Sequence, residues 1–159
     1  MKLHLLRHAK TEAASTSGKD FDRALLKKGI EQSKLMNQYL LENKLTISKV
    51  FSSDAKRTRQ TFSYLKDTFV EKEIIYDNQF YLAEKEILLK FINNQTTSED
   101  IFIIGHNNGI SDLAEYLTNE FVDLQTCEFI SIEFKIEKWN EASQGLGTIT
   151  ERFHPQVLN

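Results

Sequence analysis

The chain has 159 residues, and a length of about 150 residues is typical of one domain. Hydrophobic residues make up 40% and charged residues 27%, which excludes a disordered protein, and one Pro with six Gly excludes collagen-like or Pro-rich architectures. A net charge of −3 argues against a protein that coats nucleic acid or an anionic membrane. The single Cys127 excludes an internal disulfide framework and a multi-cysteine zinc cage, and it fits a reducing compartment such as the cytosol.

The first eight residues begin like a signal peptide, but their apolar stretch is short and is interrupted by His4 and Arg7. We therefore interpret them as part of the mature fold. No apolar run approaches the ~18 residues that a membrane span needs. We expect a cytoplasmic protein that has neither a membrane nor a nucleic acid as its partner.

Strands and helices are predicted to alternate along the first two thirds of the chain. The predicted elements are a strand over 2–7, a polar loop over 11–22, a helix over 25–44, a strand over 47–52, a helix beginning near 54, a strand over 74–76, a helix over 84–94, a strand over 101–104 and, after a Gly-flanked turn over 105–109, a last helix. Asp54 is the predicted N-cap of the second helix. No linker or repeat divides the chain, so we expect a single domain over 1–159.

Each predicted helix has an apolar face that we expect to point into a core. The expected inward residues are Leu25, Leu26, Ile30, Met36, Leu40, Leu41 and Leu45 in the first helix, Ala55, Thr58, Phe62, Leu65 and Phe69 in the second, Ile87, Leu88, Phe91 and Ile92 in the third, and Ile110, Leu113, Ala114 and Leu117 in the fourth.

The last third of the chain predicts antiparallel strands. Residues 129–136 alternate between apolar and polar, a turn region follows at 141–147, and a further strand is predicted over 147–153. The continuous apolar run Ile101–Ile104 is typical of a central strand that is buried on both faces. Together these patterns predict an α/β domain with a mostly parallel central sheet, flanking helices and a C-terminal antiparallel hairpin.

Charged and imidazole side chains come directly after three of the predicted strands. Arg7 and His8 end the first strand, Arg57 lies at the start of the helix after the second, and His106 comes after the central strand. Ligands of open α/β sheets bind at the carboxyl ends of the strands. Each of these residues alone is more often structural, but their occurrence at the same ends predicts one site.

The residue types at this edge suit an anionic, phosphorylated substrate. Arginine presents a planar fork of donors that matches phosphate oxygens and keeps its charge. A histidine beside such charges has a lowered pKa, which keeps its ring neutral and able to attack. Lys10, Lys56 and Arg59 lie next to these residues in sequence and are expected to make the edge locally basic. Cations of this kind can replace a metal in phosphoryl transfer.

Four segments carry a resemblance to the histidine phosphatase superfamily. The stretch 7–11 (RHAKT) resembles its R-H-G/A-x-S/T signature, and 22–25 (DRAL) with Gly29 resembles its D-x-P-L…G segment. The stretch 52–61 (SSDAKRTRQT) resembles S-S-P-x-x-R-A-x-Q-T, and 105–109 (GHNNG) resembles G-H-N-P-G. All four occur in the family's order. The short length and the Arg-His-Ala form resemble the SixA-like phosphohistidine phosphatase branch.

The resemblance implies a metal-free phosphatase without a cofactor. In this reading His8 is the nucleophile that becomes transiently phosphorylated, Arg7 and Arg57 bind the phosphoryl group, and His106 completes the pocket. The implied substrate is phosphohistidine or another phosphorylated protein, with a small phosphorylated molecule as the alternative. The chain departs from the motifs at Ala9, and also at Asp54 and Asn108, which replace prolines; these changes concern turn rigidity.

The identity of a general acid stays open. Larger family members have an acidic proton donor, and the candidates here are Glu84 and Asp20, although a surface carboxylate is the commoner role for either. A phosphoramidate nitrogen leaves more readily than an alkoxide, so an enzyme of this branch could work without a strong acid.

Other readings compete with this one. A metal site that joins His4 and His8 is disfavoured because four extended residues separate them by roughly 13 Å. Residues 17–20 (SGKD) lack the pattern of a P-loop, and His154 is expected at the surface. The remaining alternatives are a small-molecule phosphomonoesterase, a phosphoglycerate-mutase-like enzyme and a catalytically silent member that binds phosphoproteins.

Overall fold

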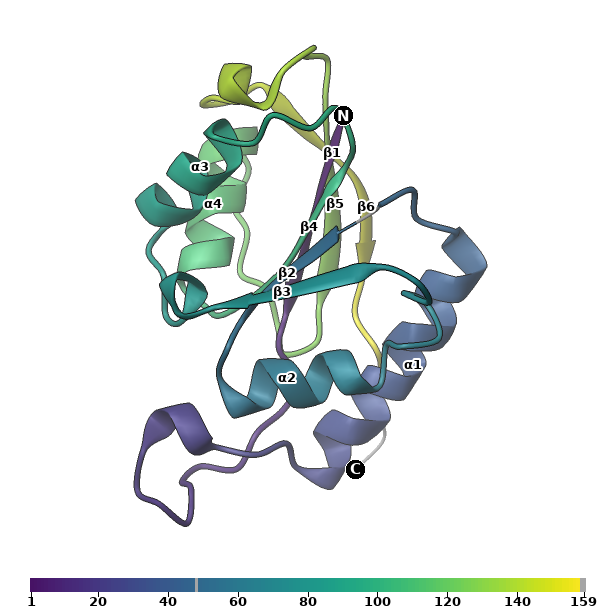
Figure 1. Ribbon diagram of the computed structural model, residues 1–159, viewed down its shortest axis with the longest axis vertical. Coiled ribbons are helices and arrows are strands. Elements are labelled where there is room, and N and C mark those ends of the chain that lie inside the picture. Colours follow the sequence, from purple (N-terminus) through teal and green to yellow (C-terminus); the bar gives the residue numbers. More distant parts are fainter. Residues whose placement is uncertain (48, 158–159) are drawn as a thin grey trace.

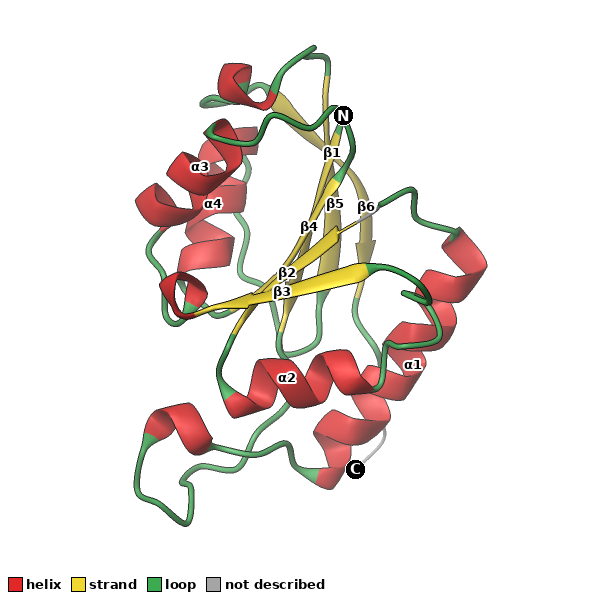
Figure 2. Ribbon diagram, in the orientation of Figure 1, coloured by secondary structure: helices red, strands yellow, loops and turns green. Residues whose placement is uncertain are grey.

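The computed structural model describes residues 1–47 and 49–157, within which six strands form one mixed sheet with helices on both faces (Figure 1, Figure 2). The strands are β1 (Lys2–Arg7), β2 (Lys49–Ser53), β3 (Glu73–Asp77), β4 (Ile101–Gly105), β5 (Phe129–Phe134) and β6 (Gly147–Phe153). The helices are α1 (Lys27–Asn43), α2 (Lys56–Ser63), α3 (Lys85–Asn93) and α4 (Gly109–Thr118), with short 3₁₀ helices η1 (Asp20–Asp22), η2 (Asn78–Phe80) and η3 (Trp139–Glu141). None of the helices in these residues is long and apolar enough to cross a membrane.

The strand order is β3-β2-β4-β1-β5-β6, and the first four strands of this order run parallel. β5 is antiparallel to both β1 and β6. The predicted fold class is therefore confirmed, including the antiparallel C-terminal pair. β4 lies between β1 and β2, and all its residues are buried, as the apolar run Ile101–Ile104 predicted.

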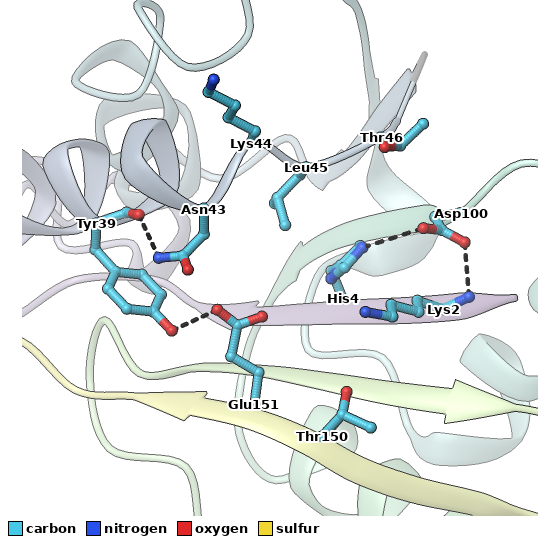
Figure 3. Close-up of a pocket in the computed structure, with 10 residues that line it drawn as sticks. All are labelled: Lys2, His4, Tyr39, Asn43, Lys44, Leu45, Thr46, Asp100, Thr150 and Glu151. Carbon is cyan, nitrogen blue, oxygen red and sulfur yellow. Dashed lines mark hydrogen bonds and ion pairs between the residues drawn. The ribbon is translucent and has the colours of Figure 1, made fainter.

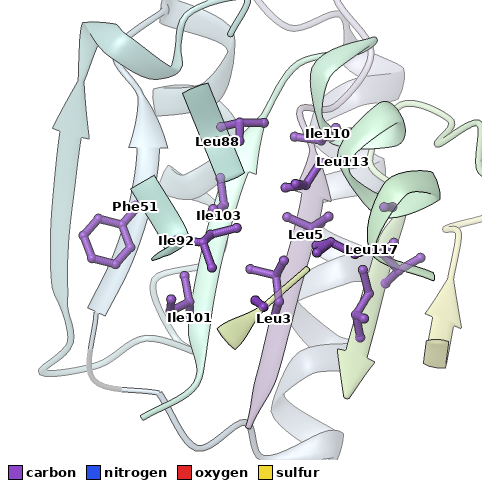
Figure 4. Close-up of a cluster of buried hydrophobic side chains, with 14 of the residues drawn as sticks. Leu3, Leu5, Phe51, Leu88, Ile92, Ile101, Ile103, Ile110, Leu113 and Leu117 are labelled. Atoms are coloured by element: carbon purple, nitrogen blue, oxygen red, sulfur yellow. The ribbon is translucent and has the colours of Figure 1, made fainter. Parts of the chain in front are cut away.

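Two apolar cores lie on opposite faces of the sheet. Alternation along β1 sends Leu3 and Leu5 to one face and Leu6 to the other. On the first face Leu113 and Leu117 of α4 cover Leu3 and Leu5 (Figure 4). On the second face the core is closed by α1 and α2, which lie across the sheet from α3 and α4 (Figure 1).

The helix limits differ from the predicted ones. Asp54 is not the N-cap of α2, because the helix begins at Lys56 after Ala55, and the Asp54 carboxylate instead pairs with Arg59. α2 ends at Ser63, so Leu65 is not part of the helix. It lies in the turns that follow, where its side chain is buried. The predicted strand over 47–52 begins at Lys49, and Ser48 lies outside the described residues.

Three predicted inward residues are exposed. In α1 the buried stripe runs through Gly29, Met36 and Leu40, so Leu41, one residue further round the helix, is 45% exposed. Leu26 precedes the helix and is 40% exposed. On α3, Ile87 is 43% exposed, whereas the expected stripe of α4 is fully buried. In α1 and α3, packing against the sheet therefore buries a narrower stripe than the whole apolar arc of the sequence.

Two glycines permit the close approach of segments near the carboxyl ends of the parallel strands. A Cβ atom on Gly29 would collide with the carbonyl oxygen of Lys10, and one on Gly109 would collide with that of Ala83. Both obstacles are backbone atoms, which cannot swing aside as a flexible side chain can. The glycines therefore fix how α1 and α4 pack against the segments after β1 and before α3.

Candidate active site

The four predicted side chains meet in one pocket of about 270 Å³ at the carboxyl ends of the parallel strands. Arg7 is the register partner of Gly105, so His8 and His106 leave neighbouring strands at the same level. Their ring centroids are 5.2 Å apart. Arg57 reaches the same pocket from the first turn of α2. The further lining residues are Lys10, Thr11, Asp20, Arg23, Leu82, Asn107 and Thr126.

His8 is held as a neutral imidazole with a defined tautomer. Its side chain is buried, and Nδ1 lies 2.8 Å from the carbonyl oxygen of Ala9. A carbonyl oxygen can only accept, so Nδ1 carries the proton and Nε2 keeps its lone pair. Burial lowers the pKa of His8 to about 3; the bond to Ala9 opposes this shift, and the charges of Arg57 and Arg7 add to it. His8 is therefore ready to act as a nucleophile at Nε2.

His106 is also neutral and is oriented by Ser53. Its Nε2 lies 2.7 Å from the Ser53 hydroxyl oxygen, which already accepts the N–H of Ala55 at 3.2 Å. The described residues offer this hydroxyl no other acceptor, so it donates its proton to Nε2 and the ring proton stays on Nδ1. Burial lowers the pKa of His106 to about 2, with further contributions from His8 and Arg57.

Three buried nitrogens that belong to residues lining this pocket have no hydrogen-bond partner within the described residues. Over all the described residues, four buried side-chain nitrogens lack a hydrogen bond. Three of them are Arg7 Nε, Arg57 Nε and His106 Nδ1. Other nitrogens of the arginines are used: Arg7 Nη1, for example, donates to the carbonyl of Leu124 at 2.8 Å. An unmet buried donor costs about 1–3 kcal/mol. An anion with several oxygens is the kind of ligand that would satisfy all three donors at once.

The basic edge is narrower than predicted. Lys10 lines the pocket, but Lys56 and Arg59 do not. The Arg59 guanidinium pairs with Asp54 and lies 3.8 Å from the centre of the ring of Tyr76 in β3.

Sequence reasoning missed Arg23 and Tyr81 as parts of the site. Arg23 donates to Asp20 at 2.9 Å, and the Tyr81 hydroxyl donates to the same carboxylate at 2.6 Å. The Tyr81 ring also meets the His106 ring edge-on at 5.6 Å. Arg23 stands inside the quoted 22–25 motif and could have been singled out there, whereas nothing in the local sequence marks Tyr81.

The two candidates for the general acid lie in different surroundings. The hydrogen bond from Tyr81, together with those from Arg23 and Arg57, holds the pKa of Asp20 far below its usual range, so this carboxylate stays ionised. Glu84 is the exposed residue before α3 and lines a neighbouring cavity of about 350 Å³ instead. Asp20 is therefore the only carboxyl group among the described residues lining the candidate pocket.

The family follows from a comparison with known proteins. The model of the histidine phosphatase superfamily (branch 1) matches residues 3–81. An uncharacterised chloroplastic protein of Arabidopsis thaliana is 30% identical over 152 residues, which are 89% of this chain and 70% of the relative. The chain belongs to the histidine phosphatase superfamily. This membership confirms the phosphatase class that the four motifs predicted.

Solved structures of histidine phosphatases share the whole fold. The putative phosphohistidine phosphatase SixA from Agrobacterium tumefaciens matches with a TM-score of 0.84 at 23% identity, over 97% of both chains. The putative SixA from Nakamurella multipartitia matches with a TM-score of 0.83 at 20% identity, over 98% of this chain and 96% of that one. A SixA structure complexed with tungstate matches with a TM-score of 0.81 at 18% identity, over 97% of both chains.

This histidine phosphatase has a larger cavity, of about 660 Å³, away from the four site residues (Figure 3). It contains His4, whose Nδ1 lies 2.7 Å from the Ser131 hydroxyl and whose Nε2 lies 3.8 Å from an Asp100 oxygen. His4 and His8 therefore line different cavities. The described residues contain no cluster of three His, Cys, Asp or Glu side chains placed to hold a metal ion.

Proposed function

We propose that this phosphatase takes a phosphoryl group from a phosphorylated protein side chain, phosphohistidine foremost, and passes it through His8 to water. One observation carries the proposal: three buried donors without partners in the described chain belong to Arg7, Arg57 and His106, which line the same pocket as His8 with its unprotonated Nε2. Donors already in place need no reorganisation when charge develops on the transferring oxygens.

The proposed reaction has two steps. In the first, the lone pair of His8 Nε2 forms a bond to phosphorus while the bond to the leaving nitrogen or oxygen breaks and its electron pair leaves with that atom. The charges of Arg7 and Arg57 and the N–H of His106 stabilise the three oxygens that do not react. In the second step water attacks phosphorus, the bond to Nε2 breaks, and phosphate leaves with His8 neutral again.

The electrostatics of the pocket favour a substrate with a good leaving group. Asp20 is held ionised, so no carboxylic acid among the described lining residues is placed to protonate a departing alkoxide. An imidazole nitrogen leaves a phosphoramidate without that help. This supports phosphohistidine over an alkyl phosphate ester, and two of the fold matches are named as putative phosphohistidine phosphatases.

Trapping the intermediate tests the proposal. The wild-type chain, His8→Ala and the control His154→Ala are incubated with a ³²P-labelled phosphohistidine protein and quenched. We expect the wild type and His154→Ala to release phosphate and to carry acid-labile, alkali-stable label on the enzyme chain. His8→Ala should do neither. Undiminished turnover in His8→Ala would overturn the proposal. Phosphoprotein binding without label or turnover in the wild type would indicate the silent, phosphoprotein-binding alternative instead.

A further inference from the structure

Asp20 occupies both terminal nitrogens of Arg57. Arg57 Nη1 donates to the main-chain oxygen of Asp20 at 2.8 Å, and Nη2 donates to its carboxylate at 3.0 Å. The Arg57 side chain is 2% exposed, so these bonds form at a buried guanidinium. The third nitrogen, Nε, is the one that has no partner within the described residues.

Asp20 is itself fixed from two other segments. The hydroxyl of Tyr81, the residue after η2, donates to the carboxylate oxygen that also receives Arg57. The second carboxylate oxygen accepts Nη1 of Arg23, whose Nε donates to the carbonyl of Glu12 at 2.7 Å. The Phe21 ring packs edge-on against the Tyr81 ring at 5.0 Å. Three donors therefore set where this carboxylate lies before any substrate arrives.

The geometry has a consequence for Arg57. A guanidinium is planar, so holding both terminal nitrogens on one residue fixes the plane and thereby the direction of the Nε–H bond. We propose that Asp20 is a positioning residue: by accepting from Nη1 and Nη2 it holds the Arg57 guanidinium in one orientation, so that the Nε–H stays directed at the phosphoryl oxygens. This inference rests on the proposed function, in which Arg57 binds the phosphoryl group.

The position of Asp20 allows two other roles, each with a different signature. A carboxylate that competes with the substrate for Arg57 would weaken anion binding, so its removal would strengthen it. A general acid would matter most for poor leaving groups. A positioning residue matters for every substrate alike, because it acts on the phosphoryl oxygens and not on the leaving group.

The experiment compares Asp20→Asn with Asp22→Asn. Asp22 belongs to the same 3₁₀ helix, but its carboxylate accepts from the exposed Ser17 hydroxyl and does not line the pocket. We measure kcat and KM with aryl phosphates of graded leaving-group pKa, and the binding of vanadate and inorganic phosphate. For Asp20→Asn we expect kcat to fall about 10- to 100-fold, equally for all leaving groups, with KM nearly unchanged. Vanadate should lose more affinity than phosphate, and Asp22→Asn should behave as the wild type.

Three results would overturn the inference: tighter phosphate binding by Asp20→Asn, a loss confined to poor leaving groups, or unchanged kcat. If Asp20→Asn does not fold, Tyr81→Phe removes one holding bond and should lower kcat in the same direction to a smaller extent. Unchanged kcat in a folded Tyr81→Phe variant would then count against the positioning of Arg57 by Asp20. Vanadate and phosphate binding do not need turnover, so they test the positioning of Arg57 even if His8 proves not to be phosphorylated.

Discussion

At the scale of single residues, the site depends on imidazoles that are buried beside permanent cations. His8 and His106 are both buried, and burial lowers their pKa values from 6.5 to about 3 and about 2. The same burial that keeps His8 unprotonated also makes the folded state sensitive to acid. In the unfolded chain these rings bind protons near their ordinary pKa, and in the folded chain they do not.

We therefore expect stability to be full above pH 6.5 and to fall as the pH drops from 6.5 towards 3. The unfolded state binds more protons in this window, so each histidine contributes a slope of up to about 1.4 kcal/mol per pH unit. Urea unfolding between pH 5 and 7 measures it. His8→Gln should have a shallower slope than the wild type, and His154→Gln should keep the wild-type slope. An identical slope in His8→Gln would contradict the buried, neutral state of this ring.

At the scale of elements, the position of α4 depends on a contact that only glycine allows. Gly109 begins this helix directly behind the turn that holds His106, and it packs against the carbonyl oxygen of Ala83. Any Cβ atom at this position must move the helix or the segment before α3. Because the turn precedes the helix, such a shift reaches His106 as well.

Gly109→Ala is expected to destabilise the fold by about 1–3 kcal/mol, which is the usual cost of overpacking a close contact. Asp112→Ala is the matched control, since Asp112 is exposed on the same helix and should change stability by no more than about 0.5 kcal/mol. Denaturant midpoints measure both. A Gly109→Ala variant as stable as the wild type would show that the two segments separate easily.

At the scale of the whole molecule, the central sheet contributes side chains to both apolar cores. Ile101 and Ile103 of β4 face one core, and Phe102 and Ile104 face the other. Loss of either core therefore removes the packing of the same strand. We expect residues 1–159 to unfold as one cooperative unit, as a single domain should.

Two probes test this expectation. Trp139 is fully buried in the core under α3 and α4, so its fluorescence reports on that side, whereas far-UV circular dichroism reports on the whole chain. The two transitions should coincide, and Ile103→Ala should shift both equally, by about 2–5 kcal/mol. Val70→Ala, at a residue 64% exposed, should leave both in place. Separate transitions in the wild type would indicate two folding units.

Helix faces show where local periodicity stops being informative. It predicted the buried residues Leu88 and Ile92 of α3 correctly and placed Ile87 beside them wrongly. Periodicity gives the arc that is apolar, and packing against one sheet decides how much of that arc is covered. The same reason explains Leu41 of α1, which is exposed although it belongs to the apolar arc.

The amino-acid sequence by itself determined which strands form and which polar side chains stand at their carboxyl ends. Parallel strands end at one edge of a sheet, so Arg7, His8 and His106 were expected at the same edge once the strands were recognised, and the strand order then placed β1 beside β4. Tertiary structure alone decided that Asp20 holds Arg57, because the oxygen that receives Arg57 also receives Tyr81, 61 residues away in the chain. Strand formation depends on neighbours in sequence, whereas the path of a polar loop depends on distant donors that meet it only in the folded protein.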